Sequence, residues 1–396
     1  MPTATPASEA QAGRSDLKPG RLYLPQLDVM RFCAFLLVFF YHGLPSSDLN
    51  RHAGLSKTIH SFFTMVIASW DNGVALFFLL SAYLIAKLLQ REKAITGTVD
   101  IKLFYIRRLL RIWPLYYLAL AIGIVLSIGS AHSLFSPELR MGVSDFLGFV
   151  FFVKNWGIAL HGFKWNPIYV LWTISSEEQF YLLWPLLQKT LTRPRLLLAC
   201  VLAMVVVPLV AFWPGGVFIA NHSTKIVFFL IYFPLGGILA ETLKDTRTPR
   251  STGWCLSRIA GGLTLWVAGS YVEFLLPGLG GPVAREILAN LLQALGTVLI
   301  FLGFLESGER WAHARLTYLG KISYGLYVFH VMALQFVGFL GIHAGIYKLA
   351  GSTVGKVIGL PFALGLTVLA AYLSYNFYEK RFLVLKDRFA IVHSRA

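Results

Sequence analysis

Two polar side chains, Arg31 and His42, interrupt an otherwise apolar segment near the start of the chain, LDVMRFCAFLLVFFYHG. Residues that are eleven positions apart on a helix lie on nearly the same side of it, so the two side chains differ by about 20° in direction and roughly 16 Å in height. Asp28 lies three residues before Arg31, on the same face, and is a natural ion-pair partner for it. Because histidine titrates near neutral pH and can act as a general base, this polar stripe predicts a lined cavity. Two alternatives remain open: Arg31 reaching the membrane boundary, and His42 being a hydrogen-bonded histidine without a chemical role.

A second polar group lies in WTISSEEQFYLLWP, residues 172–185, where Glu177 and Glu178 fall within a segment otherwise fit to cross a membrane. Carboxylates in such a segment are costly and indicate a functional site. Glu177 shares a helical face with Tyr181, whereas Glu178 points in another direction, so at least one carboxylate must face protein. The alternative is that both carboxylates lie at the membrane boundary and cap the helix.

A third group is basic and lies in FYIRRLLRIWPLYY, residues 104–117. Arg108 and Arg111 share one helical face, with Arg107 beside them. Their permanently charged guanidinium groups could bind phosphate in a bidentate manner. The alternative is ordinary anchoring of a membrane helix by basic residues at its cytoplasmic end.

Two further polar residues, Tyr327 and His330, share a face in YLGKISYGLYVFH, residues 318–330, and predict a polar patch there. The three cysteines are scattered along the chain and follow no disulfide or metal-ligand spacing. We therefore expect free thiols and no metal site.

The composition places these groups in a membrane protein. The chain has 396 residues, of which 56% are hydrophobic and only 14% charged, compared with about 25% charged residues in soluble domains. Apolar runs of roughly 17 to 25 residues recur along the sequence, as a hydrocarbon core about 30 Å thick requires. The sequence predicts an all-α, polytopic membrane helix bundle of about ten transmembrane helices, at residues 27–45, 72–89, 112–130, 168–188, 196–214, 224–242, 259–277, 284–305, 322–343 and 355–377.

The charge distribution predicts the topology. With the N- and C-termini in the cytoplasm, 24 basic residues lie inside and nine outside, as the positive-inside rule favours, so the net charge of +16 does not indicate nucleic-acid binding. Residues 145–160 could form an eleventh span, but that would reverse every later loop, and we expect an interfacial or re-entrant segment instead. Residues 1–22 are expected to be a disordered cytoplasmic tail, residues 23–380 the membrane domain and residues 381–396 a basic cytoplasmic tail.

These motifs, together with GVALFFLLSAYLI, resemble in kind and in order those of the acyltransferase-3 family of bacterial membrane O-acyltransferases. The resemblance implies an enzyme of the cell inner membrane with acyl-CoA, commonly acetyl-CoA, as co-substrate. Its acceptor would be a hydroxyl of an extracytoplasmic glycan or lipid-linked saccharide. The family's Ser-Gly-Phe turn reads Ser81-Ala82-Tyr83 here, which could alter the shape of the pocket. Because no hydrolase-like domain follows the last predicted span, we expect a stand-alone member.

The resemblance also implies roles for individual residues. The family's essential pair falls on Arg31 and His42, and its span carboxylate on Glu177. We expect His42 to act as general base, Arg31 to line the route to it, and Glu177 to orient the imidazole or hold the acceptor. The guanidinium groups expected to bind coenzyme A phosphates are those of Arg107, Arg108 and Arg111. The side chains assigned to substrate binding are Glu178, Tyr181, Tyr327 and His330.

Two other functions fit the same features. A transporter or flippase for a saccharide or other polar substrate would also need many spans and buried polar residues, although the sequence has no internal repeat of the kind that many transporters show. A non-catalytic scaffold is the third interpretation. The acceptor, the acyl chain length, the oligomeric state and the choice between direct transfer and an acyl-enzyme intermediate are not determined by the sequence.

Overall fold

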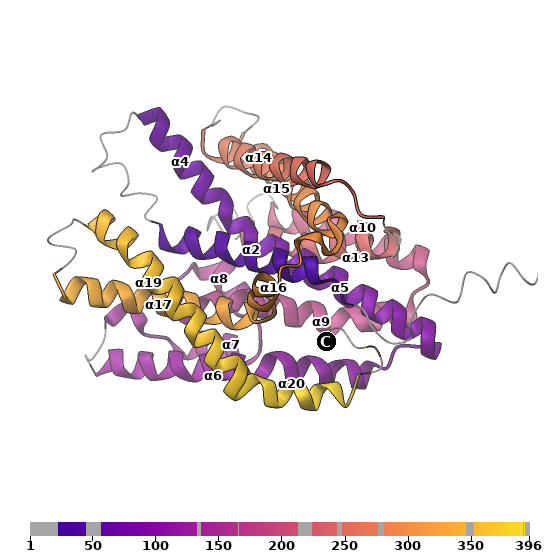
Figure 1. Ribbon diagram of the computed structural model, residues 1–396, viewed down its shortest axis with the longest axis horizontal. Helices are drawn as coiled ribbons and strands as arrows, with labels where there is room; N and C mark the ends of the chain where they lie inside the picture. Colours follow the sequence, from indigo (N-terminus) through magenta and orange to yellow (C-terminus); the bar gives the residue numbers. More distant parts are fainter. Residues whose placement is uncertain are drawn as a thin grey trace, which may run out of the picture.

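The structure is a computed structural model that describes residues 23–44, 57–132, 136–164, 166–212, 224–243, 248–275, 281–345, 352–390 and 392. These residues form helices and their connections, without a strand. Most of the long helices run along the longest axis of the molecule (Figure 1). The prediction of an all-α helix bundle is therefore confirmed. The predicted tail 1–22 lies outside the described residues. Of the predicted tail 381–396, residues 391 and 393–396 also lie outside them, whereas residues 381–387 belong to a helix, α20 (Lys380–Asp387).

All ten predicted spans fall on helices. The long helices are α2 (Pro25–Gly43), α5 (Gly73–Thr96), α6 (Ile101–Ala131), α9 (Trp172–Thr190), α10 (Arg193–Ala211), α14 (Thr252–Leu275), α15 (Gly281–Glu306), α17 (Ser323–His343) and α19 (Ser352–Leu373). The shorter helices are α4 (Lys57–Ser69), α7 (Val143–Val150), α8 (Lys154–His161), α12 (Thr224–Phe228), α13 (Tyr232–Thr242), α16 (Ala314–Lys321) and α20 (Lys380–Asp387). Helix α4, which was not predicted, leads into α5 through a single 3-10 turn.

Seven helical stretches of the described chain are long and apolar enough to cross a membrane. They contain α5, α6, α10, α13, α15, α17 and α19. Helices α2, α9 and α14 are as long as other spans but less apolar, and α2 and α9 are the helices that carry Arg31 and Glu177. The total of ten spans and the side on which the termini lie stay predictions.

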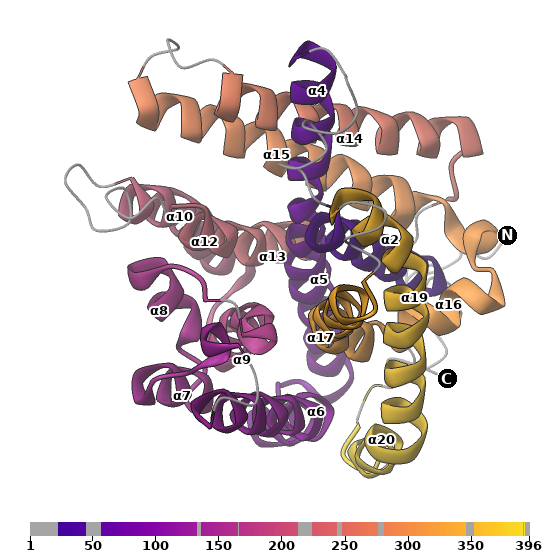
Figure 2. The same cartoon turned by 90° about the vertical axis from the view of Figure 1, so that its left-hand side faces the viewer.

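Residues 145–160 do not form a span. They fold into α7 and α8, each of eight residues, and a helix of that length rises only about 12 Å against a hydrocarbon core of about 30 Å. Figure 2 shows both short helices on the outer side of α6 and α9. The expectation that this segment is not an eleventh span is confirmed.

A buried carboxylate fixes the bend between α7 and α8. Asp145 accepts hydrogen bonds from the ammonium groups of Lys154 and Lys164, and from the Gly142 backbone N–H. Burial alone would raise the pKa of Asp145, but these donors together hold it well below its ordinary value. Lys154, which belongs to the segment expected to be interfacial or re-entrant, is buried in this ion pair.

Helix α2 lies at the centre of the fold because two glycines let neighbouring backbones approach it. A Cβ atom at Gly73, where α5 begins, would lie 2.7 Å from the Ala34 carbonyl oxygen. A Cβ atom at Gly320 of α16 would lie only 1.8 Å from the Asp28 carbonyl oxygen. Small residues of this kind permit close helix packing, and here they hold α5 and α16 against the polar face of α2.

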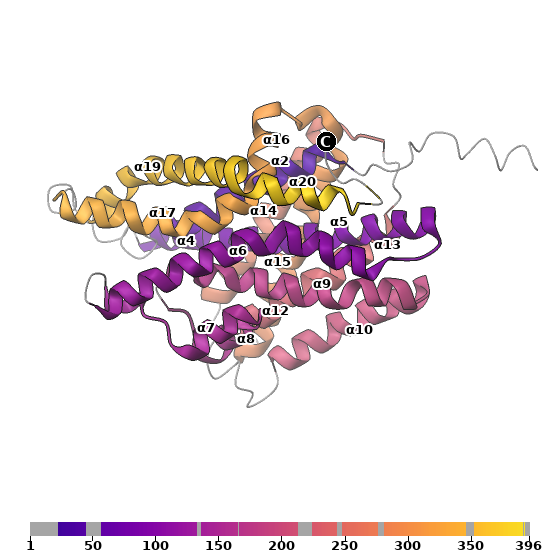
Figure 3. The same ribbon diagram turned by 90° about the horizontal axis from the view of Figure 1, so that it is seen from below.

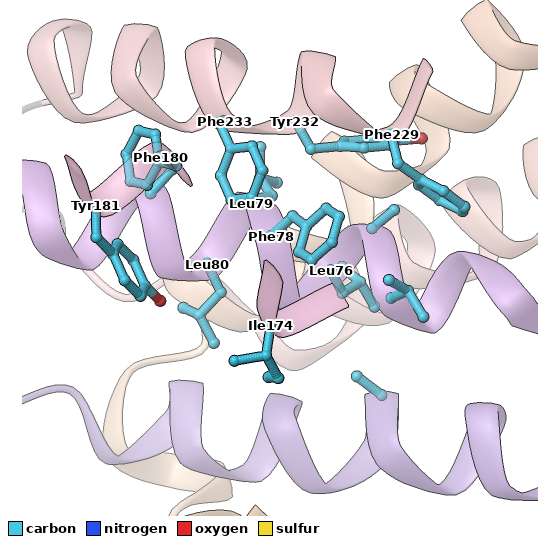
Figure 4. Close-up of a cluster of buried hydrophobic side chains, with 14 of the residues drawn as sticks. Leu76, Phe78, Leu79, Leu80, Ile174, Phe180, Tyr181, Phe229, Tyr232 and Phe233 are labelled. Carbon is cyan, nitrogen blue, oxygen red and sulfur yellow. The ribbon is translucent and has the colours of Figure 1, made fainter. Parts of the chain in front are cut away.

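An aromatic cluster joins α5, α9 and α13 (Figure 4). The Phe233 ring lies between those of Phe78 and Phe180, with ring centroids 4.7 Å and 4.8 Å away. The contacts of this aromatic cluster are purely apolar, and they fix the register of α9 against α5. In Figure 3, α9 runs between α6 and α10, so one face of α9 is available to polar contacts with α6 and α5.

Candidate active site

Five helices distant in sequence, α2, α5, α6, α9 and α17, enclose a cavity of about 140 Å³, enough for on the order of ten water molecules. Figure 2 shows these helices around a common centre. Six of the ten residues assigned to the site from sequence line this cavity: Arg31, Arg108, Arg111, Glu177, Tyr181 and Tyr327. Asp28, the predicted partner of Arg31, lines it as well.

A chain of hydrogen bonds crosses the cavity wall from α5 to α9. The Tyr181 hydroxyl donates to Glu177 Oε2 at 2.9 Å and lies 2.6 Å from Ser81 Oγ. Because Tyr181 has one hydroxyl hydrogen and gives it to the carboxylate, Ser81 must donate to Tyr181. The chain runs from Ser81 through Tyr181 to Glu177 and ends on a carboxylate that faces the cavity.

The same end of the cavity is rich in guanidinium groups. Arg108 lies over the rings of Phe104 and Tyr181, with its central carbon 5.6 Å and 5.7 Å from their centroids. Its buried Nε has no hydrogen-bond partner among the described residues, and other atoms of Arg108 line the cavity. Arg111 also lines the cavity and, with Arg108, interacts electrostatically with Glu177.

Arg31 occupies the opposite wall and is paired as predicted. Its Nη1 donates to Asp28 Oδ1, and Asp28 is almost completely buried. The ion pair lowers the cost of placing a charged side chain within the bundle. The cavity at this end therefore contains three guanidinium groups and two carboxylates, from helices α2, α6 and α9.

The other end of the cavity finishes beneath a pair of histidines. Tyr327 donates its hydroxyl hydrogen to the Val170 carbonyl, in the 3-10 turn before α9, and accepts a hydrogen bond from the Thr173 hydroxyl on α9. Its ring packs against His330 with centroids 5.4 Å apart. His330 is fully buried, and its Nε2 lies 3.4 Å from Nδ1 of His42. His42 is exposed at the end of α2, and neither histidine is among the described lining residues.

The packing of α2 on α5 gives the separation of the two ends. Gly73 contacts Ala34 and Val38. From this level, Ser81 lies eight residues along α5 in one direction, and His42 lies four to eight residues along α2 in the other. At 1.5 Å per residue, the two side chains are roughly 20 Å apart along the bundle. Glu177, which shares the Ser81 end, is therefore not in contact with His42, and the residue beside the imidazole is His330.

Two predicted site residues lie elsewhere. Arg107 is buried in an ion pair with Glu92, Nη2 to Oε2 at 2.8 Å, and donates to the Phe389 carbonyl at 2.9 Å. Glu178 turns away from the cavity toward Trp113, whose Nε1 lies 3.4 Å from Glu178 Oε2. The structure thus does not bring Arg107 or Glu178 to the cavity.

Among the further lining residues that were not assigned to the site from sequence are three with hydroxyl groups, Ser81, Thr173 and Tyr324. Thr173 lies four residues before Glu177, and this spacing is a signal that could have identified it. Tyr324 similarly lies three residues before Tyr327 and donates to the Ile112 carbonyl at 2.9 Å. Helical spacing gives no signal for Ser81 within the apolar sequence of α5, and its only signal was the family's Ser-Gly-Phe turn, which reads Ser81-Ala82-Tyr83 here.

Comparison with known proteins agrees with the arrangement of these motifs. The family model described as an acyltransferase domain, that of acyltransferase-3, matches residues 24–376. Peptidoglycan O-acetyltransferase OatA of Listeria monocytogenes is 29% identical over 200 residues, which cover 46% of this chain and 28% of OatA. A putative peptidoglycan O-acetyltransferase of Bacillus subtilis, YrhL, is 26% identical over 395 residues, which cover 90% of this chain and 54% of YrhL.

A putative O-acetyltransferase of Staphylococcus aureus is 31% identical over 176 residues, 43% of this chain and 25% of the relative. The chain thus matches only about a quarter to a half of the length of these curated relatives. No solved structure matches it. Because the family model extends over nearly all of the described helices, from the start of α2 to the end of α19, the chain belongs to the acyltransferase-3 family.

Proposed function

We propose that this protein is a membrane O-acyltransferase that moves an acyl group, commonly acetyl, from cytoplasmic acyl-CoA to a hydroxyl of an extracytoplasmic glycan. The observation that carries the proposal is the shape of the site. Guanidinium groups gather at one end of a cavity within the bundle, and an exposed histidine lies just beyond its other end. A phosphate-bearing donor and a hydroxyl acceptor could approach from opposite sides.

The guanidinium end suits the phosphates of coenzyme A. Arg108 and Arg111 both line the cavity, and the buried Nε of Arg108 has no hydrogen-bond partner among the described residues. A planar guanidinium group binds phosphate oxygens through parallel hydrogen bonds, and these bonds are stronger where water is excluded. Arg107 is not part of this proposal because its donors are occupied by Glu92 and Phe389.

The Ser81–Tyr181–Glu177 chain shapes the donor end. Tyr181 supports the Arg108 guanidinium with its ring while its hydroxyl is held by Glu177. The carboxylate also offsets part of the positive charge, so that Arg108 and Arg111 are stable in the absence of a ligand. In the proposed function, Glu177 is therefore a positioning residue for the arginines and has no direct contact with the imidazole of His42.

The reaction at the other end needs a base. An alcohol attacks the thioester carbonyl, its proton passes to His42, the C–S bond breaks as the C–O bond forms, and the sulfur leaves with a proton as the free thiol. General-base catalysis of this kind contributes roughly 10²- to 10⁴-fold. The roughly 20 Å between His42 and Ser81, which lies at the arginine end of the cavity, favours direct transfer, with the long arm of the donor extended along the cavity past Arg31. An acyl group held on Ser81 would be too far from an acceptor at His42.

The proposed acceptor class comes from two of the relatives, which are named as a peptidoglycan O-acetyltransferase and a putative peptidoglycan O-acetyltransferase. The exposure of His42 agrees with a bulky acceptor that does not enter the bundle. The test is to incubate purified protein in liposomes with radiolabelled acetyl-CoA and a peptidoglycan fragment. A labelled glycan is expected, whereas a transporter would leave no covalent product.

A further inference from the structure

The neighbouring imidazoles of His42 and His330 have only one arrangement of hydrogens that satisfies their contacts. His330 Nδ1 lies 2.6 Å from the Tyr327 carbonyl oxygen. Because a carbonyl only accepts, the hydrogen of neutral His330 must be on Nδ1, which leaves Nε2 as an acceptor. That acceptor faces His42 Nδ1 at 3.4 Å.

The contacts of His42 agree with this assignment. Its Nδ1 lies 2.9 Å from the Val38 carbonyl oxygen and must therefore donate. The N–H is then shared between Val38 and Nε2 of His330, and Nε2 of His42 is left with its lone pair. The atom of His42 that can take a proton is thus Nε2, on the ring edge away from both hydrogen-bond partners.

We propose that His330 is a positioning residue that fixes the tautomer and ring orientation of His42. This inference rests on the proposed function, in which His42 is the base, and reassigns His330 from the substrate-binding role expected from sequence. A hydrogen-bond partner at Nδ1 selects the tautomer of a catalytic histidine, a role that a carboxylate often performs. Here a neutral imidazole performs it, and it accepts the Nδ1 hydrogen more strongly once His42 becomes an imidazolium.

The packing around His330 holds this arrangement in place. Its ring is fully buried and contacts the Phe35 ring edge-on, with centroids 6.1 Å apart, and the Tyr327 ring on another side. Tyr327 is in turn fixed by its hydroxyl contacts with α9 and the 3-10 turn before it. The imidazole therefore has little freedom to rotate, and its Nε2 stays directed at His42.

Nitrogen NMR of histidine-labelled protein in liposomes tests the arrangement directly, with the His42 and His330 signals identified by single substitutions. We expect the wild-type protein to carry hydrogens on Nδ1 of both residues, bare Nε2 atoms, and a correlation between His42 Nδ1 and His330 Nε2. A hydrogen on Nε2 of either residue would overturn the proposal. This measurement needs no substrate, so its result is separate from the success or failure of the proposed function.

Steady-state kinetics test what this arrangement of His330 and His42 contributes to the reaction. His330→Phe should lower kcat about 10- to 100-fold, the usual effect of losing a residue that orients a functional histidine, and leave KM for acetyl-CoA unchanged. His330→Gln should recover most of kcat, because its amide oxygen can accept from His42. The matched control is His343→Gln, since His343 on the same helix makes the same contact, Nδ1 to the Phe339 carbonyl at 2.9 Å, but is exposed. A Gln variant as slow as the Phe variant, or a change in KM alone, would contradict the proposed role.

Discussion

The hydroxyl of Tyr181 donates a 2.9 Å hydrogen bond to Glu177, one helical turn away on α9. The ring of the same tyrosine lies under the guanidinium of Arg108. One side chain thus connects the carboxylate and the basic group of the cavity. The two functions of Tyr181, hydroxyl donor and aromatic surface, can be separated by substitution.

Tyr181→Phe removes the hydroxyl and keeps the ring under Arg108. We expect kcat/KM for acetyl-CoA to fall about tenfold, since the loss of one hydrogen bond to a charged group costs about 1.5–3 kcal/mol and part of this is recovered by relaxation. Tyr181→Ala also removes the cation–π contact, so its kcat/KM for acetyl-CoA should fall further. Steady-state kinetics of the purified variants provide the measurement, and equal activity of wild type and Tyr181→Phe would exclude the hydroxyl from the donor site.

Arg107 and Arg108 are neighbours in sequence with opposite expected phenotypes. Arg108→Ala should raise KM for acetyl-CoA at least tenfold with little change in thermal stability, because Arg108 faces the cavity. Arg107→Ala leaves Glu92 buried without its partner and should destabilise the fold by about 3–5 kcal/mol. Melting temperatures in detergent, measured together with the kinetic constants, distinguish the loss of donor binding expected in Arg108→Ala from the loss of stability expected in Arg107→Ala.

A double variant provides the control for this pair. Replacing a buried ion pair by apolar residues is often neutral, so Arg107→Met combined with Glu92→Leu should recover most of the melting temperature. If Arg107→Ala instead raised KM and kept its stability, Arg107 would belong to the donor site after all.

The sequence located some residues of the cavity but could not show contacts between distant helices. Charge in an apolar segment located Arg31, Glu177 and the Asp28 ion pair, but the same signal also selected Glu178, which does not line the cavity. Helical spacing placed Arg108 and Arg111 on one face. The spacing could not show that Arg107 finds Glu92, because that contact joins residues on two different helices. The same limit applies to His330, whose partner His42 lies 288 residues away in sequence.

The Asp145 ion pairs predict a pH dependence of stability outside the membrane spans. Because the pKa of this carboxyl is lower in the folded state than in the unfolded chain, its contribution is fully present above a pH of about 4 and is lost as the pH falls below that value. Asp145→Asn should lower the melting temperature at pH 7, where it leaves Lys154 buried without a carboxylate, and the difference from wild type should shrink at pH 3. A difference that stays constant between these pH values would show that the charge of Asp145 does not stabilise the fold.

Gly320 is expected to be intolerant of any side chain. A Cβ atom there would lie 1.8 Å from the Asp28 carbonyl oxygen, so Gly320→Ala must displace α16 from α2 and disturb Asp28 and Arg31. We expect loss of folded protein in size-exclusion chromatography. Gly365→Ala in α19 is the matched control, since nothing lies within 4 Å of its Cβ position, and it should behave as wild type.

The central claim is that His42 takes the proton of the acceptor hydroxyl while the donor is held at the arginine end of the cavity. The most direct test uses liposomes that contain purified wild type or His42→Ala, labelled acetyl-CoA and a glycan acceptor, with donor binding measured in parallel. We predict that His42→Ala inserts normally, binds acetyl-CoA as well as wild type and forms no acetylated glycan. Product formation by folded His42→Ala at the wild-type rate would contradict this account.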